Sequence, residues 1–145
     1  MQLADQMQQD AWVPDVIMGI ARGGMLPALI LSHHLGVPLV CHHVSLRDHV
    51  QKDAVHQIAP LLEQGKRMLI LDDINDSGAT IQAVKAQLNQ LIVSYELEHV
   101  LPDQVRFGVL IHKKSSTQSV HYHAHVVYEA DDHIWWHFPW EKSID

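Results

Sequence analysis

The sequence has little of several features that mark specialised classes of protein. A single cysteine, Cys41, excludes an internal disulfide framework. No apolar run is long enough to cross a bilayer or follows a basic signal-peptide start, so we expect a cytoplasmic protein without a membrane partner. No Pro-, Gly- or Ser-rich tract and no repeat divides the 145 residues, which predicts a single domain over residues 1–145.

Positively charged residues are also scarce. The chain has 10 Lys and Arg against 17 Asp and Glu, a formal net charge of −7. Nucleic-acid binding draws on clustered Lys and Arg, which replace the counterions of the phosphates. We therefore expect no nucleic-acid partner. A small anionic ligand is still compatible with this composition if its charge is met locally.

Apolar segments of strand length alternate with segments of helical period. We expect strands at 15–20, 37–43, 66–74, 104–113 and 123–130, and helices at 23–36 and 78–100, the second closed by Pro102. Apolar strands that alternate with helices predict an α/β fold, with a parallel sheet covered on both faces. Such sheets bind ligands beyond the carboxyl ends of their strands.

An acidic cluster stands at one of these ends, in the stretch MLILDDINDSGAT (68–80), where apolar residues lead into Asp72, Asp73 and Asp76. Carboxylates accept hydrogen bonds from ribose hydroxyls and suit Mg²⁺, which takes oxygen ligands. The turn from Ser77 to Thr80 opens a helix, and a helix N-terminus favours a phosphate. Together these residues predict a site for a sugar phosphate with a metal. The alternative is a helix cap with spare acids in a solvated loop.

The same stretch resembles the phosphoribosyl-pyrophosphate (PRPP) signature of type I phosphoribosyltransferases. The resemblance implies that Asp72 and Asp73 contact the ribose hydroxyls and place Mg²⁺. It also implies a loop that wraps the 5′-phosphate, formed by Asp76, Ser77, Gly78, Ala79 and Thr80. The fold it implies is a single-domain parallel twisted sheet flanked by helices, with a small C-terminal base-binding hood.

A second motif, GIARGGMLPA, follows the first predicted strand and resembles the pyrophosphate loop of that family. Its glycines follow neither a dinucleotide GxGxxG nor a Walker A spacing. The resemblance implies that Arg22, Gly23 and Gly24 bind pyrophosphate, and that the peptide bond between Ala21 and Arg22 is cis. The alternative is a plain glycine turn that starts a helix.

Near the C-terminus, IWWHFPWE resembles the base-binding hood of the xanthine-guanine and hypoxanthine phosphoribosyltransferase branch. The resemblance implies that Trp135 stacks on a purine, that the backbone of Trp136 reaches its 2-position, and that Glu141 lies near the same edge. We expect the aromatic rings of Phe138 and Trp140 to pack in the core instead.

Another residue of that branch is a lysine after the fourth strand, which donates to the 6-oxo group of the purine. The motif VLIHKK puts Lys113 at this position, with Lys114 next to it. A 6-oxo group accepts a hydrogen bond, whereas the 6-amino group of adenine would not. The alternative is that both lysines are solvated charges at a strand end.

Taken together, the resemblance implies transfer of a 5-phosphoribosyl group from PRPP to a 6-oxopurine (guanine, xanthine or hypoxanthine), with release of pyrophosphate and Mg²⁺ as cofactor. Asp76 would be the catalytic residue, taking a proton near purine N7 as N9 attacks. The family implies a homodimer or a homotetramer. Because the fold also hosts regulators that bind PRPP without turnover, a regulatory protein is the alternative function.

Three further segments carry weaker predictions. The loop that would cover the reacting centre falls within 44–60, and the N-terminal segment is short for the helix that this branch usually has there. His121, His123 and His125 would share one face of an extended strand. They could bind Zn²⁺, but without a Cys partner or an HExxH motif a polar strand face is the better interpretation.

Overall fold

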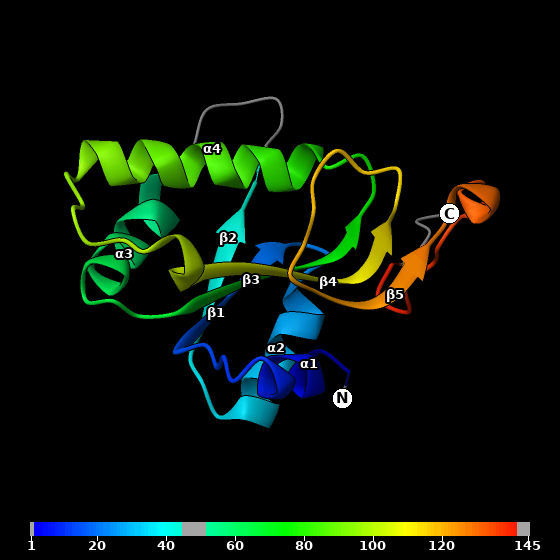
Figure 1. Ribbon diagram of the computed structural model, residues 1–145, viewed down its shortest axis with the longest axis horizontal. Coiled ribbons are helices and arrows are strands. Elements are labelled where there is room, and N and C mark those ends of the chain that lie inside the picture. Colours follow the sequence, from blue (N-terminus) through cyan, green and yellow to red (C-terminus); the bar gives the residue numbers. More distant parts are fainter. Residues whose placement is uncertain (1, 45–51, 142–145) are drawn as a thin grey trace.

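The computed structural model describes residues 2–44 and 52–141, which form one sheet with helices on both of its faces (Figure 1). The elements, in chain order, are α1 (Gln2–Gln9), β1 (Val16–Ala21), α2 (Met25–Leu35), β2 (Leu39–His43), α3 (Lys52–Glu63), β3 (Met68–Asn75), α4 (Ala79–Ser94), the 3-10 turn η1 (Pro102–Gln104), β4 (Val105–Lys113), β5 (Tyr122–Val127) and the 3-10 turn η2 (Glu129–Asp131). The five strands match the five that the sequence predicts, within a few residues at each end.

The sheet has the strand order β2-β1-β3-β4-β5, and every pair of neighbours is parallel. The prediction of a parallel α/β sheet is therefore confirmed. Its two central strands, β1 and β3, are almost entirely apolar until their last residues, because helices cover them on both sides.

Two apolar clusters fill the space between the sheet and the helices. On one face α3 and α4 pack against the strands, and this cluster includes Ile58, Leu62, Val84, Leu88, Met18, Ile70 and Phe107. On the other face α1 and α2 do so, with Leu3, Met7, Ala28, Leu31, Ile17, Leu71 and Tyr122. Figure 1 shows the sheet between α4 on one side and α1 and α2 on the other. The packing holds the strands side by side, so that their carboxyl ends meet at one edge.

The predicted helix over 78–100 is too long at its C-terminal end. The helix ends at Ser94, and Glu96 takes a positive φ of 52°. The N–H of Leu97 then donates to the Ile92 carbonyl (3.0 Å) and closes the end. Leu97 and Val100 still pack against the core from this non-helical segment. Their apolar period therefore reflects burial and not a continued helix.

The covering loop is predicted to lie within 44–60, and α3, which starts at Lys52, takes up the second half of that range. The helix is held in place by Ile58, Ala59 and Leu62, which are buried in the core. Residues 45–51 lie outside the described residues.

The N-terminal segment forms a helix despite its shortness. From α1, the Gln6 side chain donates to the His123 carbonyl (2.7 Å) and accepts from the His123 N–H (3.2 Å). It thereby pairs with backbone groups of β5, the last strand of the sheet. No helix in residues 2–44 and 52–141 is long and apolar enough to span a membrane.

Candidate active site

The sequence-predicted residues on β1, β3 and β4 meet at the carboxyl edge of the sheet. In the register of the sheet Gly19 of β1 lies beside Leu71 of β3, and Asn75 of β3 lies beside His112 of β4. The loop after β1 therefore reaches Asp72 and Asp73. Asp76 directly follows Asn75, and Lys113 directly follows His112. Asp76 and Lys113 are therefore neighbours as well.

The loop after β1 packs directly against Asp73. A Cβ atom on Gly23 would lie 2.0 Å from Asp73 Oδ2, and one on Gly24 would lie 2.3 Å from the Leu71 carbonyl oxygen. Only glycine fits at these two positions, because any side chain would clash with the carboxylate or with the backbone of β3. The peptide bond between Ala21 and Arg22 is cis, as the sequence resemblance predicts.

Not all the N–H groups of this loop are free to bind an anion. The Gly24 N–H donates to the Ile20 carbonyl at 2.8 Å and continues the turn into α2. The N–H groups of Arg22 and Gly23 have no hydrogen-bond partner in the part of the chain that the structure describes. These two N–H groups and the exposed Arg22 side chain are the donors that the loop can offer to a pyrophosphate.

Asp72 and Asp73 form a close pair of carboxylates. Asp72 Oδ1 accepts from the Asp73 N–H (2.9 Å), and Asp73 Oδ1 accepts from the Ile74 N–H (2.7 Å). Burial, and then the charge of Asp73, raise the pKa of Asp72 to about 7. Burial also raises the pKa of Asp73. Each carboxylate thus uses one oxygen for a backbone N–H, and the two carboxyl groups lie close enough to share a proton when no ligand is bound.

These two carboxylates fit a magnesium ion that is shared with a substrate. Mg²⁺ is usually held by one or two carboxylates together with phosphate oxygens and water, and not by an all-protein cage. The raised pKa of Asp72 comes from burial and then from the charge of Asp73, and a cation bound between the two carboxylates would offset both. No group of three or more His, Cys, Asp or Glu in the described residues could hold a metal ion by itself.

The turn between β3 and α4 is held open by a neighbouring loop. Gly78 has a φ of 94°, and a Cβ atom on it would lie 2.6 Å from Thr117 Oγ1. Thr117 in turn donates to the Ser77 carbonyl from its N–H (3.1 Å) and from its hydroxyl (2.9 Å). The N–H groups of Gly78 and Thr80 have no partner within residues 2–44 and 52–141, so both can donate to a phosphate.

Lys113 ends β4 between two carboxylates. Its Nζ lies 2.8 Å from Asp76 Oδ1 and 2.9 Å from Asp132 Oδ1. Hydrogen bonds to these two acids raise the pKa of Lys113, and those from Lys113 and Ser115 lower the pKa of Asp132. The ammonium group has three N–H donors, so one is left for a ligand.

Sequence reasoning missed the network that supports this edge. Asn75, which is 2% exposed, donates to His112 Nδ1 (3.0 Å) and to the Gln118 carbonyl (2.7 Å), and accepts from the Ser116 hydroxyl (2.8 Å). It thereby ties the 115–118 loop to β3. The available signal was the polar run Ser-Ser-Thr-Gln directly after a predicted strand, at the edge where ligands bind.

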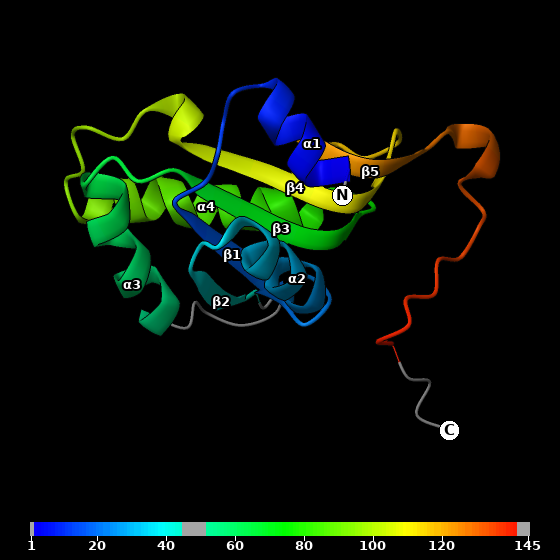
Figure 2. The same cartoon turned by 90° about the horizontal axis from the view of Figure 1, so that it is seen from below.

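The aromatic residues near the C-terminus lie in the segment that follows β5. Figures 1 and 2 both show this segment running past β5 and away from the rest of the sheet. Trp135 is 78% exposed, with the His137 ring at its edge, and Trp136 is half-buried beside His125. Glu141 is near enough for its charge to raise the pKa of Asp73. Of the predicted base-binding residues, Lys113 is thus brought to Asp76 and Glu141 towards Asp73, while the rings of Trp135 and Trp136 contact His137 and His125 instead.

The expected core positions of Phe138 and Trp140 are only partly correct. Their rings stack on each other with centroids 4.9 Å apart, and both are half-buried. Trp140 also lines a small apolar cavity with residues of α1 and α2. The two side chains therefore cover the surface of the helical layer and do not enter either core cluster.

The histidine-rich strand forms a polar face. His121 and His125 are exposed and His123 is half-buried. Although the His121 residue as a whole is exposed, partial burial of its ring lowers its pKa, and its Nδ1 accepts from the Phe107 N–H at 3.0 Å. None of the three belongs to a metal-binding group in the described part of the chain.

Known proteins are similar to this chain in sequence and in the arrangement of their strands and loops. The chain is 28% identical over 132 residues, 88% of this chain and 71% of the relative, to xanthine-guanine phosphoribosyltransferase of Idiomarina loihiensis. It is 36% identical over 81 residues, 55% of this chain and 39% of the relative, to orotate phosphoribosyltransferase of Oceanobacillus iheyensis. Among solved structures, purine phosphoribosyltransferase from Pyrococcus horikoshii superposes with a TM-score of 0.60 and 25% identity, over 97% of this chain and 88% of that chain.

The phosphoribosyl transferase domain matches residues 1–143. This match includes the glycine loop after β1, the acidic stretch at the end of β3 and Lys113 at the end of β4. The chain therefore belongs to the phosphoribosyltransferase family.

Proposed function

We propose that the protein transfers the 5-phosphoribosyl group of PRPP to a 6-oxopurine and releases pyrophosphate. The observation that carries the proposal is the convergence of two loops and a lysine at one edge of the sheet. Gly23 packs on Asp73, and Lys113 contacts Asp76, so groups suited to pyrophosphate, ribose and base lie on three adjacent strands. The xanthine-guanine relative, which aligns over most of both chains, supports a purine more than the orotate relative does.

The leaving pyrophosphate would bind the loop after β1. As the bond from C1′ to the pyrophosphate oxygen breaks, negative charge grows on that oxygen and C1′ gains oxocarbenium character. The free N–H groups of Arg22 and Gly23, together with the Arg22 guanidinium, are donors for this charge. The packing of this loop against β3 already fixes these donors, so they need to move little during the reaction.

The ribose and its 5′-phosphate would be held by β3 and the turn that follows it. The carboxylates of Asp72 and Asp73 can accept from the 2′- and 3′-hydroxyls. The N–H groups of Gly78 and Thr80, at the start of α4, can donate to the 5′-phosphate. Bound Mg²⁺ would be held by Asp72 and Asp73 and would offset the negative charge of the pyrophosphate.

The purine would lie between Lys113 and the aromatic segment. The third N–H donor of Lys113 suits the 6-oxo oxygen, and the exposed Trp135 ring can stack on the base. Asp76 accepts from Lys113 through Oδ1, which leaves Oδ2 to take a proton near N7 as N9 forms the bond to C1′. The three contacts together hold N9 in line with the leaving group.

The test is an assay of PRPP consumption and pyrophosphate release with Mg²⁺ and five bases: hypoxanthine, guanine, xanthine, adenine and orotate. We expect turnover with at least one 6-oxopurine and little with adenine or orotate. Turnover with adenine or orotate alone would contradict the assignment of Lys113. PRPP binding without turnover on any base would favour a regulatory protein instead.

We also propose that the protein is a homodimer or homotetramer. Leu26, Leu29 and Ile30 expose 39%, 43% and 50% of their surface at i, i+3 and i+4 of α2, so three apolar side chains share one exposed helix face that a second copy could cover. Light scattering coupled to size exclusion measures the mass directly. A 16.5 kDa species at all concentrations would contradict the proposal.

A further inference from the structure

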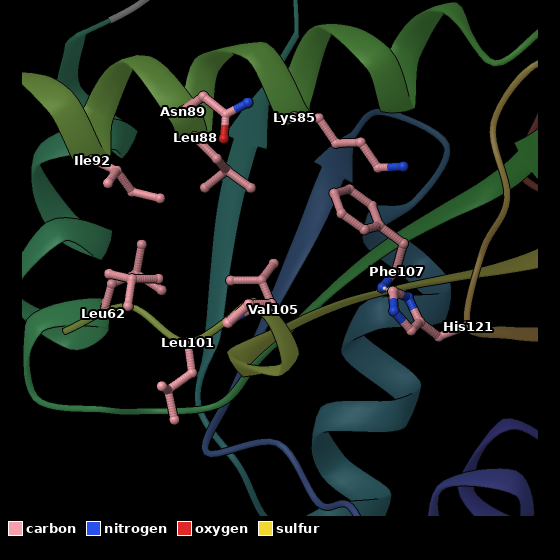
Figure 3. Close-up of a pocket in the computed structure, with 11 residues that line it drawn as sticks. Leu62, Lys85, Leu88, Asn89, Ile92, Leu101, Val105, Phe107 and His121 are labelled. Atoms are coloured by element: carbon pink, nitrogen blue, oxygen red, sulfur yellow. Dashed lines mark hydrogen bonds between the residues drawn. The ribbon is translucent and has the colours of Figure 1, made fainter. Parts of the chain in front are cut away.

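A second cavity lies beneath α4, away from the candidate active site. It has a volume of about 340 Å³ and lies between α4, the 96–105 segment and the start of β4. Figure 3 shows it bounded by Leu62, Lys85, Leu88, Asn89, Ile92, Leu101, Val105, Phe107 and His121. None of these residues belongs to the carboxyl edge of the sheet, and β4 enters the cavity by its opposite, amino-terminal end.

The lining is apolar on most sides and contains no acidic residue. The side chains of Leu88 and Ile92 project from α4 into the cavity, and Leu62 and Val105 lie opposite them (Figure 3). Leu101 is 67% exposed and stands at the rim. The polar side chains of the lining are Lys85, Asn89 and His121. The cavity is therefore suited to an apolar body that carries a polar group at one end.

Lys85 supplies a positive charge at that end. Its Nζ lies 5.4 Å from the centre of the Phe107 ring and donates to Gln118 Oε1 at 2.9 Å. An ammonium group has three N–H donors, so two are left for a ligand. Within the described residues no carboxylate lies at ion-pair distance from Lys85. Its contacts among the described residues are with a neutral amide and a ring face.

His121 adds a neutral donor on the other side of Phe107. Its Nδ1 accepts the Phe107 N–H at 3.0 Å, so the hydrogen-bond network assigns its proton to Nε2. Partial burial of the ring, and then the charge of Arg106, lower the pKa of His121, which favours its neutral form. Lys85 is the one lysine or arginine among the described residues that line the cavity.

We propose that this cavity binds a small organic monoanion, an aromatic or similarly bulky apolar body with one carboxylate, whose carboxylate pairs with Lys85. The volume lies at the lower end of the range of about 300–1,000 Å³ that small-molecule sites occupy, which limits the ligand to roughly one ring with a short side chain. The apolar walls would bury the ring, and the lysine would select the charge. This site is separate from the proposed transferase site and does not depend on it.

A purely structural role for Lys85 is the competing explanation. In that case Lys85 only joins α4 to the 115–118 loop through Gln118, and the cavity is an imperfectly packed region that binds no ligand. The two explanations differ in what happens when the charge is removed. A structural lysine affects stability alone, whereas a ligand-binding lysine affects the affinity for an anion and not for its neutral analogue.

The experiment uses the ¹⁵N-labelled full chain and two probes of equal size, 3-phenylpropionate and 3-phenyl-1-propanol. We expect 3-phenylpropionate to shift the backbone amide signals of Leu88, Phe107 and His121. We expect the alcohol to bind about fivefold more weakly or worse, as for the loss of one partly exposed ion pair. Equal affinity for the two probes, or shifts scattered over the surface, would overturn the proposal.

Three variants separate binding from folding. Lys85→Met keeps the length of the side chain and should weaken 3-phenylpropionate about fivefold without changing the affinity for the alcohol. Lys66→Met is the matched control, because Lys66 is 47% exposed and lies outside the cavity, and it should bind like the wild type. Gln118→Met removes the hydrogen bond of Lys85 but not its charge, and should retain binding. Loss of binding in Gln118→Met with retention in Lys85→Met would assign Lys85 to structure.

A blocking variant provides an independent check. Asn89 lines the cavity from an exposed position on α4, so Asn89→Phe adds a large side chain at the rim without removing core atoms. We expect this variant to keep the wild-type melting temperature and to lose binding of both probes. Undiminished binding in Asn89→Phe would place the probes elsewhere and contradict the proposal.

Discussion

Lys113 Nζ lies 2.8 Å from Asp76 Oδ1, which joins the proposed donor to the base with the proposed proton acceptor. Asp76 directly follows β3 and Lys113 ends β4, and they meet because the two strands pair in parallel register up to Asn75 and His112. Asp132 contacts the same ammonium group from the segment after β5. The charge of Lys113 is therefore held in one place by two carboxylates, with one N–H left for a substrate.

Removing the Lys113 donor should reduce the use of 6-oxopurines. We expect Lys113→Met to lower kcat/KM for the purine about 10- to 100-fold, because a hydrogen bond to a charged group contributes about 1.5–3 kcal/mol. Lys114→Met is the control, since Lys114 is the exposed neighbour and should retain wild-type kinetics. Steady-state kinetics with varied purine measures both. If Lys113→Met and Lys114→Met change kcat/KM for the purine equally, Lys113 is a surface charge and not a donor to the base.

Asp76 and Asp132 contact the same lysine but should differ in function. Asp76→Asn keeps the shape of the side chain and removes its basicity, so turnover should fall about 10²- to 10⁴-fold with PRPP binding nearly intact. Asp132→Asn removes a comparable ion pair with Lys113 and should keep most of the turnover. Single-turnover rates at varied PRPP distinguish chemistry from binding. Wild-type rates in Asp76→Asn would leave this residue as a support of the turn before α4.

Trp135 should affect the base and not the fold. We expect Trp135→Ala to raise KM for the purine about tenfold or more, as base stacking on an aromatic ring contributes about 1–3 kcal/mol, with KM for PRPP little changed. The melting temperature should stay the same, because the side chain is 78% exposed. Tyr128→Ala, at 62% exposure in the same segment, is the control and should change neither. A stability loss with unchanged purine affinity would contradict a role in stacking.

The glycine at position 23 should be essential for PRPP use. A methyl group there would lie 2.0 Å from Asp73 Oδ2, so Gly23→Ala has to displace either the loop or the carboxylate. We expect kcat/KM for PRPP to fall about 100-fold or more, the usual result of a displacement of about 1 Å in an active site. Gly36→Ala, at a positive φ but in open space, should lower stability and leave the kinetics intact. Wild-type PRPP kinetics in Gly23→Ala would contradict a role of the loop after β1 in binding PRPP.

The pH dependence of stability should reveal the carboxylate pair. The pKa of Asp72 is about 7 in the folded protein and 3.8 without the fold, so ionisation costs stability as the pH rises from about 4 to 7. Without ligands, Asp72→Asn should therefore be more stable than the wild type at pH 8, by about 1–2 kcal/mol or roughly 3–6 °C. This difference should disappear below about pH 3, where the carboxyl group is protonated in both states.

Ligands should reverse this difference. With Mg²⁺ and PRPP present at pH 8, the wild type should gain more in melting temperature than Asp72→Asn, because only the wild type keeps both carboxylates for the metal and the ribose. Thermal unfolding followed by circular dichroism, with and without the two ligands, gives all four values. An Asp72→Asn variant that is destabilised at pH 8 without ligands would contradict the raised pKa.

The sequence by itself determined the strands and the type of chemistry at their ends. Runs such as Met68 to Leu71 are apolar because both faces of the sheet are covered, and the change to Asp72 and Asp73 marks the point where the strand leaves the core. These are local patterns that do not depend on distant residues. The glycine loop after β1 is also local, and its resemblance to a known motif correctly predicted the cis bond at Arg22.

The tertiary structure alone decided which distant residues meet. Register between β3 and β4 brings Asp76 to Lys113, and the 115–118 loop holds Gly78 through Thr117, although nothing in the spacing of these residues predicts either contact. The end of α4 at Ser94 also depended on tertiary contacts. Leu97 and Val100 continue the apolar pattern because they pack on the core, and this packing, not helix propensity, sets their conformation. Periodicity records which residues are buried, but only the folded chain specifies which residues they are buried against.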